Sequence, residues 1–474
     1  MTALTARTLS GSETTLGRER LKGLSDRLRG PLLTDGDAGY DEARTLWNAM
    51  IDERPALIAR CTGAADVRAA VTFAREHEIL LSVHGGGHNV AGKAVSEAGL
   101  MIDLSPMSGV RVDPEARTAR VGGGAVMADL DHEAQAFGLA TTGGIVSTTG
   151  VAGITLGGGL GWLSRRHGLV HDNLVSADVL TAGGELVQAS EKKNSELFWG
   201  LRGGGGNFGV ATSFEFELHE VGPEVLNVRL IYPYEAVPET LRFYREFMAD
   251  APPEVQVYAA LLRGTPEFGL PEPLHGKTLL AFRGLFVGDI DEGREAFRPL
   301  REFGDPIADL TQPIPYTVHQ NQADDLYREG HRNYWKANFY EELSDGLIEA
   351  VVEHVDPLPS PYSTVFFEWM GGAIAERAPD ATAFPHRDAA FSLTVAPKWE
   401  DPARDEEMIA WARQFHEATA PYASDGVYVN YLDQDESDRV SAAYGGTHDR
   451  LVELKNEWDP ENLFRVNQNI EPTV

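Results

Sequence analysis

The sequence predicts an α+β protein in which one domain is interrupted by the insertion of another. In residues 1–222, clusters of glycine separate short helices and strands. From residue 223 to 424 glycines become rarer, and strands such as 278–287 alternate with helices such as 292–303, which is typical of a sheet with helices on one face. Residues 425–474 are again aromatic with Asn-rich turns, so we expect this segment to return to the first domain.

Length and composition set the class of protein. The 474 residues, 42% of them hydrophobic and 9% aromatic, are enough to bury a large core without disulfide or metal support. Cys61 is the single cysteine, which excludes a disulfide framework and a cysteine-rich metal site. No apolar stretch approaches the ~20 residues of a membrane helix, and Met1–Leu24 does not read as a signal peptide. We therefore expect a cytoplasmic protein with no membrane partner.

The charge balance is strongly acidic. Asp and Glu number 72 against 41 Lys and Arg, which gives a formal net charge of −31, and only 8 of the 41 basic residues are lysines. A nucleic-acid partner is disfavoured because the field of the protein would repel a phosphate backbone. Few lysines and many carboxylates are typical of proteins adapted to high salt, where ions screen the repulsion. We expect a halophilic protein, the alternative being an ordinary acidic one.

Periodicity and turn residues place the elements of the first domain. Residues 66–76 form an amphipathic helix with Val67, Ala70 and Val71 on one face. Residues 175–181 and 185–189 flank an Ala-Gly-Gly turn and predict a hairpin. The same criteria predict a second helix over 126–137 closed by Gly138, a third over 195–201, and strands over 79–83, 100–104, 119–121 and 210–218.

A run of three glycines follows the strand predicted at 79–83. Gly85, Gly86 and Gly87 expose backbone N–H groups and permit positive φ, a combination that favours an anion nest for a pyrophosphate. A structural turn is the alternative. His84 and His88 are spaced as a helical metal pair, but three glycines argue against the helix that such a pair requires. We therefore expect no metal site.

Two further glycine clusters do not match the common phosphate-binding motifs. Gly204–Gly209 has the spacing G-x-G-x-x-G, but it follows a predicted helix and opens a strand, the reverse of the dinucleotide fingerprint. Gly150–Gly161 lacks the Lys-Ser/Thr pair of a P-loop. Several such loops together indicate a large nucleotide cofactor held by a different fold.

Seven motifs in order give the chain a specific resemblance. They are Arg54–Ile58, Gly85–His88, Gly157–Asn173, Leu197–Val210, Phe384–Arg387, Val429–Tyr431 and Asp459–Ile470. With them the chain resembles flavoproteins of the vanillyl-alcohol-oxidase superfamily, in the berberine-bridge-enzyme-like branch. The resemblance implies a PCMH-type FAD-binding domain of two α+β subdomains, built from 1–222 and 425–474. It also implies an inserted substrate-binding domain, 223–424, with an antiparallel sheet and helices on one face.

The resemblance also assigns residues to the cofactor, FAD. His88 matches the histidine that is covalently linked to the flavin, and a non-covalent contact is the alternative. Many members carry a second link through a cysteine where this chain has Val146, and Cys61 lies in another motif, so the resemblance implies a single link. The other positions that it assigns to FAD are Gly85, Gly86, Gly87, Asn89, Gly92, Thr149, Gly150, Gly153, Gly158, Gly161, Asn207, Gly209, Val210, Asn430 and Asn467.

For catalysis the resemblance places Tyr431 and Glu368 beside the flavin. Oxidation of a C–H bond next to oxygen or nitrogen needs a group that takes the heteroatom's proton, and a carboxylate near a phenol suits that task. The alternatives are a surface acid for Glu368 and a packing role for Tyr431. Lys336 is a further candidate for facing the substrate. Thr149 matches the position at the oxygen-reacting edge, where its size leaves room for O2, and the alternative is a loop residue that only forms hydrogen bonds.

The expected function is that of an FAD-dependent oxidase. Hydride passes from an alcohol or amine carbon of a small molecule to the flavin, and O2 is reduced to hydrogen peroxide. The alternatives are a dehydrogenase with another acceptor and a flavin-retaining protein that sequesters a drug-like molecule. The acidic run 433–438 lacks the glycine and distal Glu of a calcium loop and is predicted to be a solvated surface. The sequence leaves the substrate and the oligomeric state open.

Overall fold

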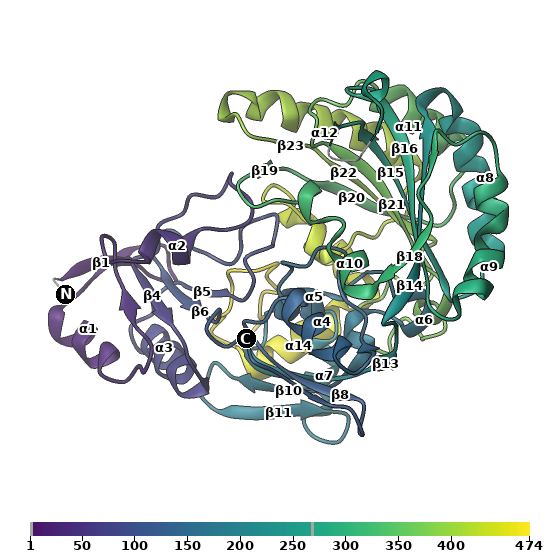
Figure 1. Ribbon diagram of the computed structural model, residues 1–474. Coiled ribbons are helices and arrows are strands. Elements are labelled where there is room, and N and C mark those ends of the chain that lie inside the picture. The colour runs from purple at the N-terminus through teal and green to yellow at the C-terminus, as the bar shows by residue number, and fades with distance from the viewer. Residues whose placement is uncertain (1–2, 267–269) are drawn as a thin grey trace.

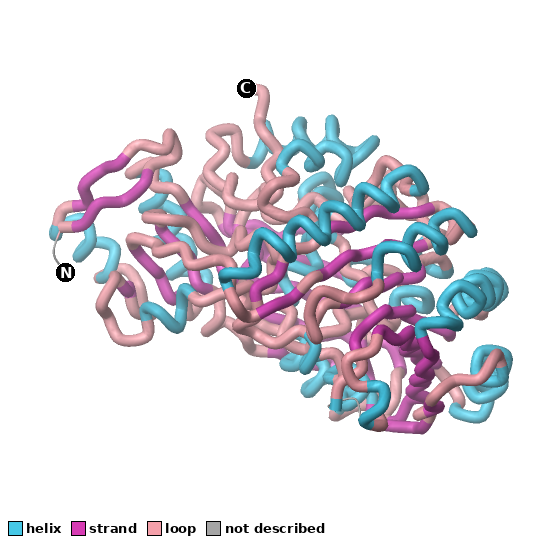
Figure 2. Tube along the Cα trace, turned by 90° about the horizontal axis from the view of Figure 1, so that it is seen from above, coloured by secondary structure: helices cyan, strands magenta, loops and turns pink. Residues whose placement is uncertain are grey.

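The computed structural model of the chain describes residues 3–266 and 270–474. It is an α+β fold built around three principal sheets (Figure 1). The N-terminal hairpin, β1 (Leu4–Arg7) and β2 (Glu13–Leu16), lies at one end of the molecule (Figure 2). Within the described ranges, no helix combines the length and apolar character needed to cross a membrane.

The first sheet has four strands and carries the triple-glycine loop. Its spatial order is β3 (Leu32–Leu33), β4 (Leu57–Arg60), β6 (Leu100–Asp103) and β5 (Leu81–His84). The pairs β4–β6 and β5–β6 are parallel. The predicted helix at 66–76 lies within α3 (Ala64–Glu76), whose residues Val67, Ala70 and Val71 are buried as expected. The remaining helices of this region are α1 (Arg18–Ser25) and α2 (Tyr40–Arg44).

The second sheet is antiparallel and has five strands. Its order is β11 (Leu186–Ser190), β10 (Leu174–Leu180), β12 (Val210–Glu217), β8 (Thr118–Gly122) and β7 (Val110–Asp113). The predicted hairpin is present as the β10–β11 pair. Its helices are α4 (Met127–Gln135), α5 (Val151–Gly157), α6 (Ser164–His167) and α7 (Ser195–Leu201), and β9 (Leu139–Ala140) pairs with β13 (His219–Glu220). The helix predicted over 126–137 ends two residues early, and Gly138 adopts a φ of 66°.

The third sheet is antiparallel, as expected of the inserted region. Its main path runs β17 (Ala308–Asp309), β14 (Glu224–Pro233), β16 (Thr278–Phe286), β15 (Val255–Arg263), β21 (Thr364–Trp369), β22 (Phe391–Ala396) and β20 (Lys336–Tyr340), and β18 (Gln312–Pro315) also pairs with β14. A short pair, β19 (Arg332–Asn333) and β23 (Lys398–Trp399), and helix α10 (Tyr316–Asn321) complete this region.

Helices cover one face of the third sheet. They are α8 (Val237–Asp250), α9 (Ile290–Glu302), α11 (Asp345–Val355) and α12 (Asp405–Thr419). Val365 and Phe367 of β21 point into the core beneath these helices, whereas Phe366 belongs to a different cluster on the opposite face. Because side chains alternate along a strand, Glu368 shares that opposite face with Phe366.

The C-terminal segment packs against the second sheet and its helices. Its elements are the 3-10 turn η9 (Val429–Tyr431), α13 (Val440–Tyr444) and α14 (His448–Trp458). Residues from Val427 to Ile470 share a buried cluster with α5 and α7, and this part appears in yellow beside α7 in Figure 1. The domain limits at 222/223 and 424/425 stay predictions.

Candidate active site

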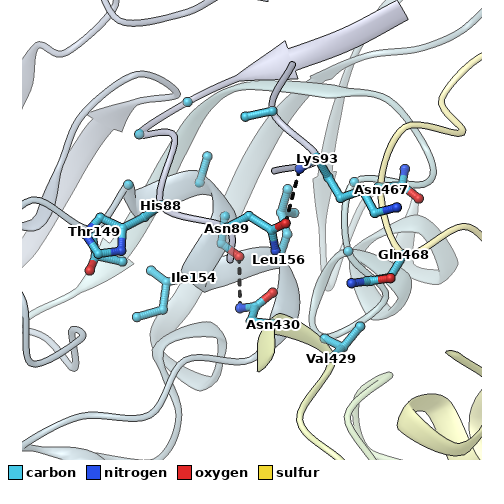
Figure 3. Close-up of a pocket in the computed structure, with 18 of the residues that line it drawn as sticks. His88, Asn89, Lys93, Thr149, Ile154, Leu156, Val429, Asn430, Asn467 and Gln468 are labelled. Carbon is cyan, nitrogen blue, oxygen red and sulfur yellow. Dashed lines mark hydrogen bonds between the residues drawn. The ribbon is translucent and has the colours of Figure 1, made fainter. Parts of the chain in front are cut away.

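One large cavity lies against all of these regions. Its empty volume is about 1760 Å³, including the part that is open to solvent. It is lined by the loop after β5, the loop before α5 and α5 itself, the start of β12, the face of β21 that the helices do not cover, and two C-terminal segments around Tyr431 and Asn467. Figure 3 shows His88 and Thr149 together on one side of this cavity, and Asn467 and Gln468 on the other.

Most of the residues assigned from sequence line this cavity. They are Gly85, Gly86, Gly87, His88, Asn89, Thr149, Gly150, Gly153, Gly209, Val210, Glu368, Asn430, Tyr431 and Asn467. Gly92, Gly158, Gly161 and Asn207, which we had also assigned to the cofactor, are not part of the lining.

In the structure these four residues make packing contacts, and their assignment to the cofactor stays a prediction. At Gly92, where φ is 70°, an added Cβ would meet Ile51 at 2.6 Å, and at Gly161 it would meet the Gly143 carbonyl oxygen. Gly158 has a φ of 136°, which favours glycine whatever the ligand. Asn207 is buried, donates to the carbonyl oxygen of Gln468 at 3.1 Å and accepts from the amide of Ile470 at 3.0 Å. Asn207 therefore holds the C-terminal segment in place through its hydrogen bonds to Gln468 and Ile470.

The glycine loop and the loop before α5 touch through their backbones. A Cβ added at Gly86 would lie 2.4 Å from Cα of Gly150, and one added at Gly150 would lie 2.7 Å from Cα of Gly86. No larger residue fits at either position. Asn89 accepts a hydrogen bond from the amide of Lys93 at 3.2 Å, and Asn430 donates to the Gly153 carbonyl oxygen at 3.3 Å (Figure 3). These contacts fix the wall on which an elongated ligand would lie.

His88 leaves the glycine loop as a half-buried side chain. Its ring stacks on Trp47, with ring centroids 4.5 Å apart and planes 19° from parallel. Its Nε2 lies 3.1 Å from the Thr148 hydroxyl. Burial lowers the pKa of His88 to about 4, so the imidazole is neutral at pH 7 and keeps a lone pair. Trp47 is a site residue that the sequence did not reveal, since no motif connects it to His88.

Glu368 and Tyr431 meet inside the cavity. Glu368 is 2% exposed, and a hydrogen bond from Tyr431 acts on its carboxylate. Burial raises the pKa of Glu368 to about 8, although the bond from Tyr431 opposes the rise. Burial and the nearby Glu368 charge raise the pKa of Tyr431 well above its usual value. Glu368 Oε2 has no hydrogen-bond partner within the described chain, so this oxygen is free for a ligand.

Aromatic side chains surround this acid–phenol pair. Trp335 and Phe366 meet the Tyr431 ring edge to face, at centroid distances of 5.3 and 6.4 Å, and Tyr428 does so at 4.8 Å. Tyr327 stands 6.0 Å from Trp335 in the same manner. All five residues line the cavity. Of these five residues only Tyr431 is predicted from the sequence, because aromatic residues of a core and of a site look alike in sequence.

Lys336 does not line the cavity, contrary to expectation. Its ammonium nitrogen lies 2.7 Å from Asp435 Oδ1 and 3.1 Å from Glu436 Oε2. The prediction that 433–438 forms a solvated surface is wrong in part, because Asp433 is 5% exposed and Glu436 is 4% exposed. Burial raises the pKa of Asp433 to about 6, and Glu436 also pairs with Arg439 at 2.6 Å. Gln434, Asp435, Ser437 and Asp438 are exposed, so the run is a surface segment that buries Asp433 and Glu436 and pairs with Lys336.

Three other positions bear on the predicted chemistry. Val146 and Thr149 both line the cavity on the same loop. Cys61 is fully buried in the core of the first sheet and is not part of the lining. Across residues 3–266 and 270–474, no group of three His, Cys, Asp or Glu side chains is arranged to hold a metal ion.

Comparison with known proteins places the chain in a family. An FAD binding domain model matches residues 55–190, and a berberine and berberine-like model matches residues 427–471. The chain is 30% identical to an FAD-linked oxidoreductase of Dictyostelium discoideum, over 94% of this chain and 96% of that protein. It is 31% identical to (R)-6-hydroxynicotine oxidase of Paenarthrobacter nicotinovorans, over 94% and 97%. The chain belongs to the berberine-bridge-enzyme-like FAD-linked oxidoreductases.

A solved structure supports the same assignment for this FAD-linked oxidoreductase. The crystal structure of 6-hydroxy-D-nicotine oxidase from Arthrobacter nicotinovorans superimposes with a TM-score of 0.85 at 27% identity, covering 94% of this chain and 98% of that one. The predicted fold class is confirmed.

The cavity of the oxidoreductase fits FAD. Its glycine-lined wall offers backbone groups at close range, and an added Cβ at Gly153 would meet nothing within 4 Å, so there is open space beside α5. Asn467 Oδ1 is buried without a hydrogen-bond partner among the described residues, as expected of an atom that awaits a ligand. The neutral His88 ring lies on the same wall.

Proposed function

We propose that the protein is an FAD-dependent oxidase of a small alcohol or amine, with O2 as acceptor. The observation that carries the proposal is the buried Glu368–Tyr431 pair, which faces the same cavity as the glycine loop and His88. FAD, when bound, would accept a hydride from the substrate carbon and deliver two electrons to O2, giving hydrogen peroxide. The relatives named as oxidases support the use of O2.

The chain's own residues supply the proton chemistry. Glu368, in its carboxylate form, takes the proton from the substrate's O–H or N–H group as hydride leaves the adjacent carbon, so that a C=O or C=N bond forms. Tyr431 donates to the carboxylate and holds it toward the cavity. Glu368 is 2% exposed, so solvent screens these interactions little. The protein would hold the cofactor through the Gly85–Gly87 backbone, His88 and Asn467.

We further propose a single covalent link from His88 to the flavin. A neutral imidazole is a nucleophile, and burial keeps His88 neutral at pH 7. Protein precipitated with acid should stay yellow, and His88→Ala should release its FAD into the supernatant. Wild-type protein that carries flavin and yet gives a colourless pellet contradicts the link. A flavin peptide that maps to Cys61 contradicts the single attachment.

Reoxidation kinetics test the choice of acceptor. The enzyme is reduced anaerobically and mixed with oxygenated buffer, while the oxidised flavin band and peroxide are followed. Fast reoxidation with one peroxide per flavin is expected, because Thr149 is small enough to leave O2 a path. Thr149→Leu should slow the reaction strongly, and Thr149→Val should not. Reoxidation over minutes in the wild type, with rapid turnover on an artificial acceptor, would identify a dehydrogenase. Absence of turnover with any acceptor would favour sequestration.

A further inference from the structure

One wall of the cavity combines aromatic rings with a carboxylate. It contains the rings of Tyr327, Trp335, Phe366 and Tyr431, with a single carboxylate, Glu368, among them. Within the described residues, no cation contributes to the pKa shift of Glu368, which arises from burial and the Tyr431 bond alone. Lys93, the lysine of the lining, lies beside Asn467 and away from His88 and Thr149 in the view of Figure 3.

We infer that the substrate is an amine cation carried on an apolar frame, with the nitrogen held between the aromatic rings and the Glu368 carboxylate. This inference rests on the proposed function, since it names the substrate class of the same site.

The arrangement of the rings supports a cation. Trp335 and Phe366 stand at 80° to each other and at 70° and 85° to Tyr431, and all three rings line the cavity. The face of an aromatic ring carries partial negative charge and attracts cations, and the attraction grows when water is excluded. A carboxylate inside such a cage adds a full negative charge and an acceptor for N–H.

The shortage of free polar atoms argues against sugars. The Tyr428 hydroxyl accepts from the amide of Gly159 at 2.8 Å and from Asn430 at 2.9 Å. The Tyr327 hydroxyl is engaged with Thr364. Glu368 Oε2 and Trp335 Nε1 are the unpartnered buried atoms that the described part of this wall offers. A sugar would bring several hydroxyls into this space without partners, at a cost for each buried group.

Oxidation of an amine at this site can be written with all protons and electrons accounted for. The ammonium form binds and gives one N–H proton to the Glu368 carboxylate, which leaves a neutral amine with its lone pair. Loss of hydride from the adjacent carbon to the bound cofactor then gives an iminium ion, and water converts this ion to a carbonyl compound and a released amine. The substrate carbon is oxidised by two electrons, and the cofactor is reduced by two.

The inference is best tested at a pH at which the buried Lys398 is neutral. Its side chain is fully buried behind the cavity wall, with Nζ 3.8 Å from the Tyr327 ring centroid and 3.3 Å from the Thr364 hydroxyl. Burial lowers the pKa of Lys398 to about 7. At pH 9 this lysine is mostly neutral and Glu368, with a pKa of about 8, is mostly ionised, so the carboxylate carries its negative charge. The buried guanidinium of Arg283, which also acts on Tyr327, has a pKa of about 10 and stays mostly charged.

The test uses the holoenzyme at pH 9 and two probes that cannot be oxidised by this route, because neither has a nitrogen lone pair. Phenyltrimethylammonium is the cation, and tert-butylbenzene is its neutral counterpart of the same shape. Binding is followed by the perturbation of the flavin absorbance band. We expect the cation to bind at least about tenfold more tightly. Glu368→Gln and Phe366→Leu should each reduce this preference, and Glu353→Gln, on the exposed surface of α11, should not.

The outcomes separate this inference from the proposed function. Equal binding of the two probes, tighter binding of the neutral one, or no binding of either overturns the amine class. Because neither probe is turned over, the result does not depend on oxidase activity. A preference for the cation without peroxide formation on any amine would support the inferred binding of amine cations and contradict the proposed oxidase activity. Peroxide formation on sugars, together with equal binding of the two probes, would support the oxidase and overturn the amine substrate class.

Discussion

At the scale of single residues, the site depends on an acid whose environment keeps it protonated. Glu368 is 2% exposed and has no cationic neighbour that lowers its pKa, which burial raises to about 8. At neutral pH most molecules therefore carry a protonated Glu368. A protonated carboxyl cannot accept the substrate proton. The fraction of enzyme with an active carboxylate therefore increases as the pH rises.

We predict that flavin reduction depends on pH through Glu368. In stopped-flow experiments under anaerobic conditions, the reduction rate with a saturating substrate should rise with pH and level off above about pH 8 to 9, because the carboxylate is the active form. Glu368→Gln should lower the rate by ~10² to 10⁴ and remove the rise. Tyr431→Phe should slow reduction while the flavin spectrum stays nearly intact.

Rates within a factor of two of wild type in both variants would remove these residues from the reaction. An effect in Glu368→Gln alone would identify Glu368 as the base and show that the Tyr431 hydroxyl is not needed to position the carboxylate. Glu353→Gln serves as the matched control, because this glutamate lies exposed on the solvent side of α11.

At the scale of elements, β21 links the fold to the chemistry. The strand places Val365 and Phe367 in the helix-covered core and Phe366 and Glu368 on the cavity side. This alternation follows from strand geometry alone. A one-residue shift in register would bury the carboxylate under the helices, so the pairing with β15 and β22 fixes the site.

Lys336 on β20 gives a second prediction at this scale. It joins the third sheet to the acidic run of the C-terminal segment through Asp435 and Glu436. Lys336→Met should lower the free energy of unfolding by about 2 kcal/mol, because it removes one of the two cationic partners of the buried Glu436 carboxylate and a partner of Asp435. Lys22→Met, which removes an exposed pair with Asp26, should cost less than about 1 kcal/mol. Denaturant unfolding monitored by fluorescence measures both.

The same variant checks the position of Lys336. Since the side chain does not line the cavity, the rate of flavin reduction in folded Lys336→Met should stay within about twofold of wild type. A loss of a hundredfold, with FAD retained, would return Lys336 to the substrate site.

The sequence predicted local features better than long-range ones. Helical periodicity predicted α3, and glycine turns predicted the β10–β11 hairpin and the triple-glycine loop, since each of these features depends on neighbours in the chain. The resemblance located His88, Glu368 and Tyr431. Trp47 could not be predicted, because its contact with His88 depends on how distant loops fold together. The acidic run was misjudged for the same reason, since its buried partner Lys336 lies about a hundred residues earlier.

At the scale of the whole molecule, charge is the dominant feature. The net charge of −31 means that many carboxylates have no basic partner, even though arginines form numerous surface pairs such as Arg44–Asp52 and Arg450–Glu196. Salt changes the stability contributed by the paired and by the unpaired carboxylates in opposite directions. It weakens the attractive pairs, and it relieves repulsion among the surplus carboxylates, which are the larger set.

We predict that the stability of the folded protein rises from low salt to molar KCl. The Debye length shrinks from ~30 Å at 0.01 M to ~3 Å at 1 M, so repulsion across the surface is almost fully screened at the higher concentration. The melting temperature of the holoenzyme, measured by calorimetry over this range, should increase. Replacing exposed acids by amides, for example Glu133→Gln, Glu349→Gln and Glu353→Gln together, should raise the melting temperature at low salt and reduce the gain from KCl. A melting temperature that stays flat or falls as KCl is added would show that this acidic surface is not an adaptation to salt.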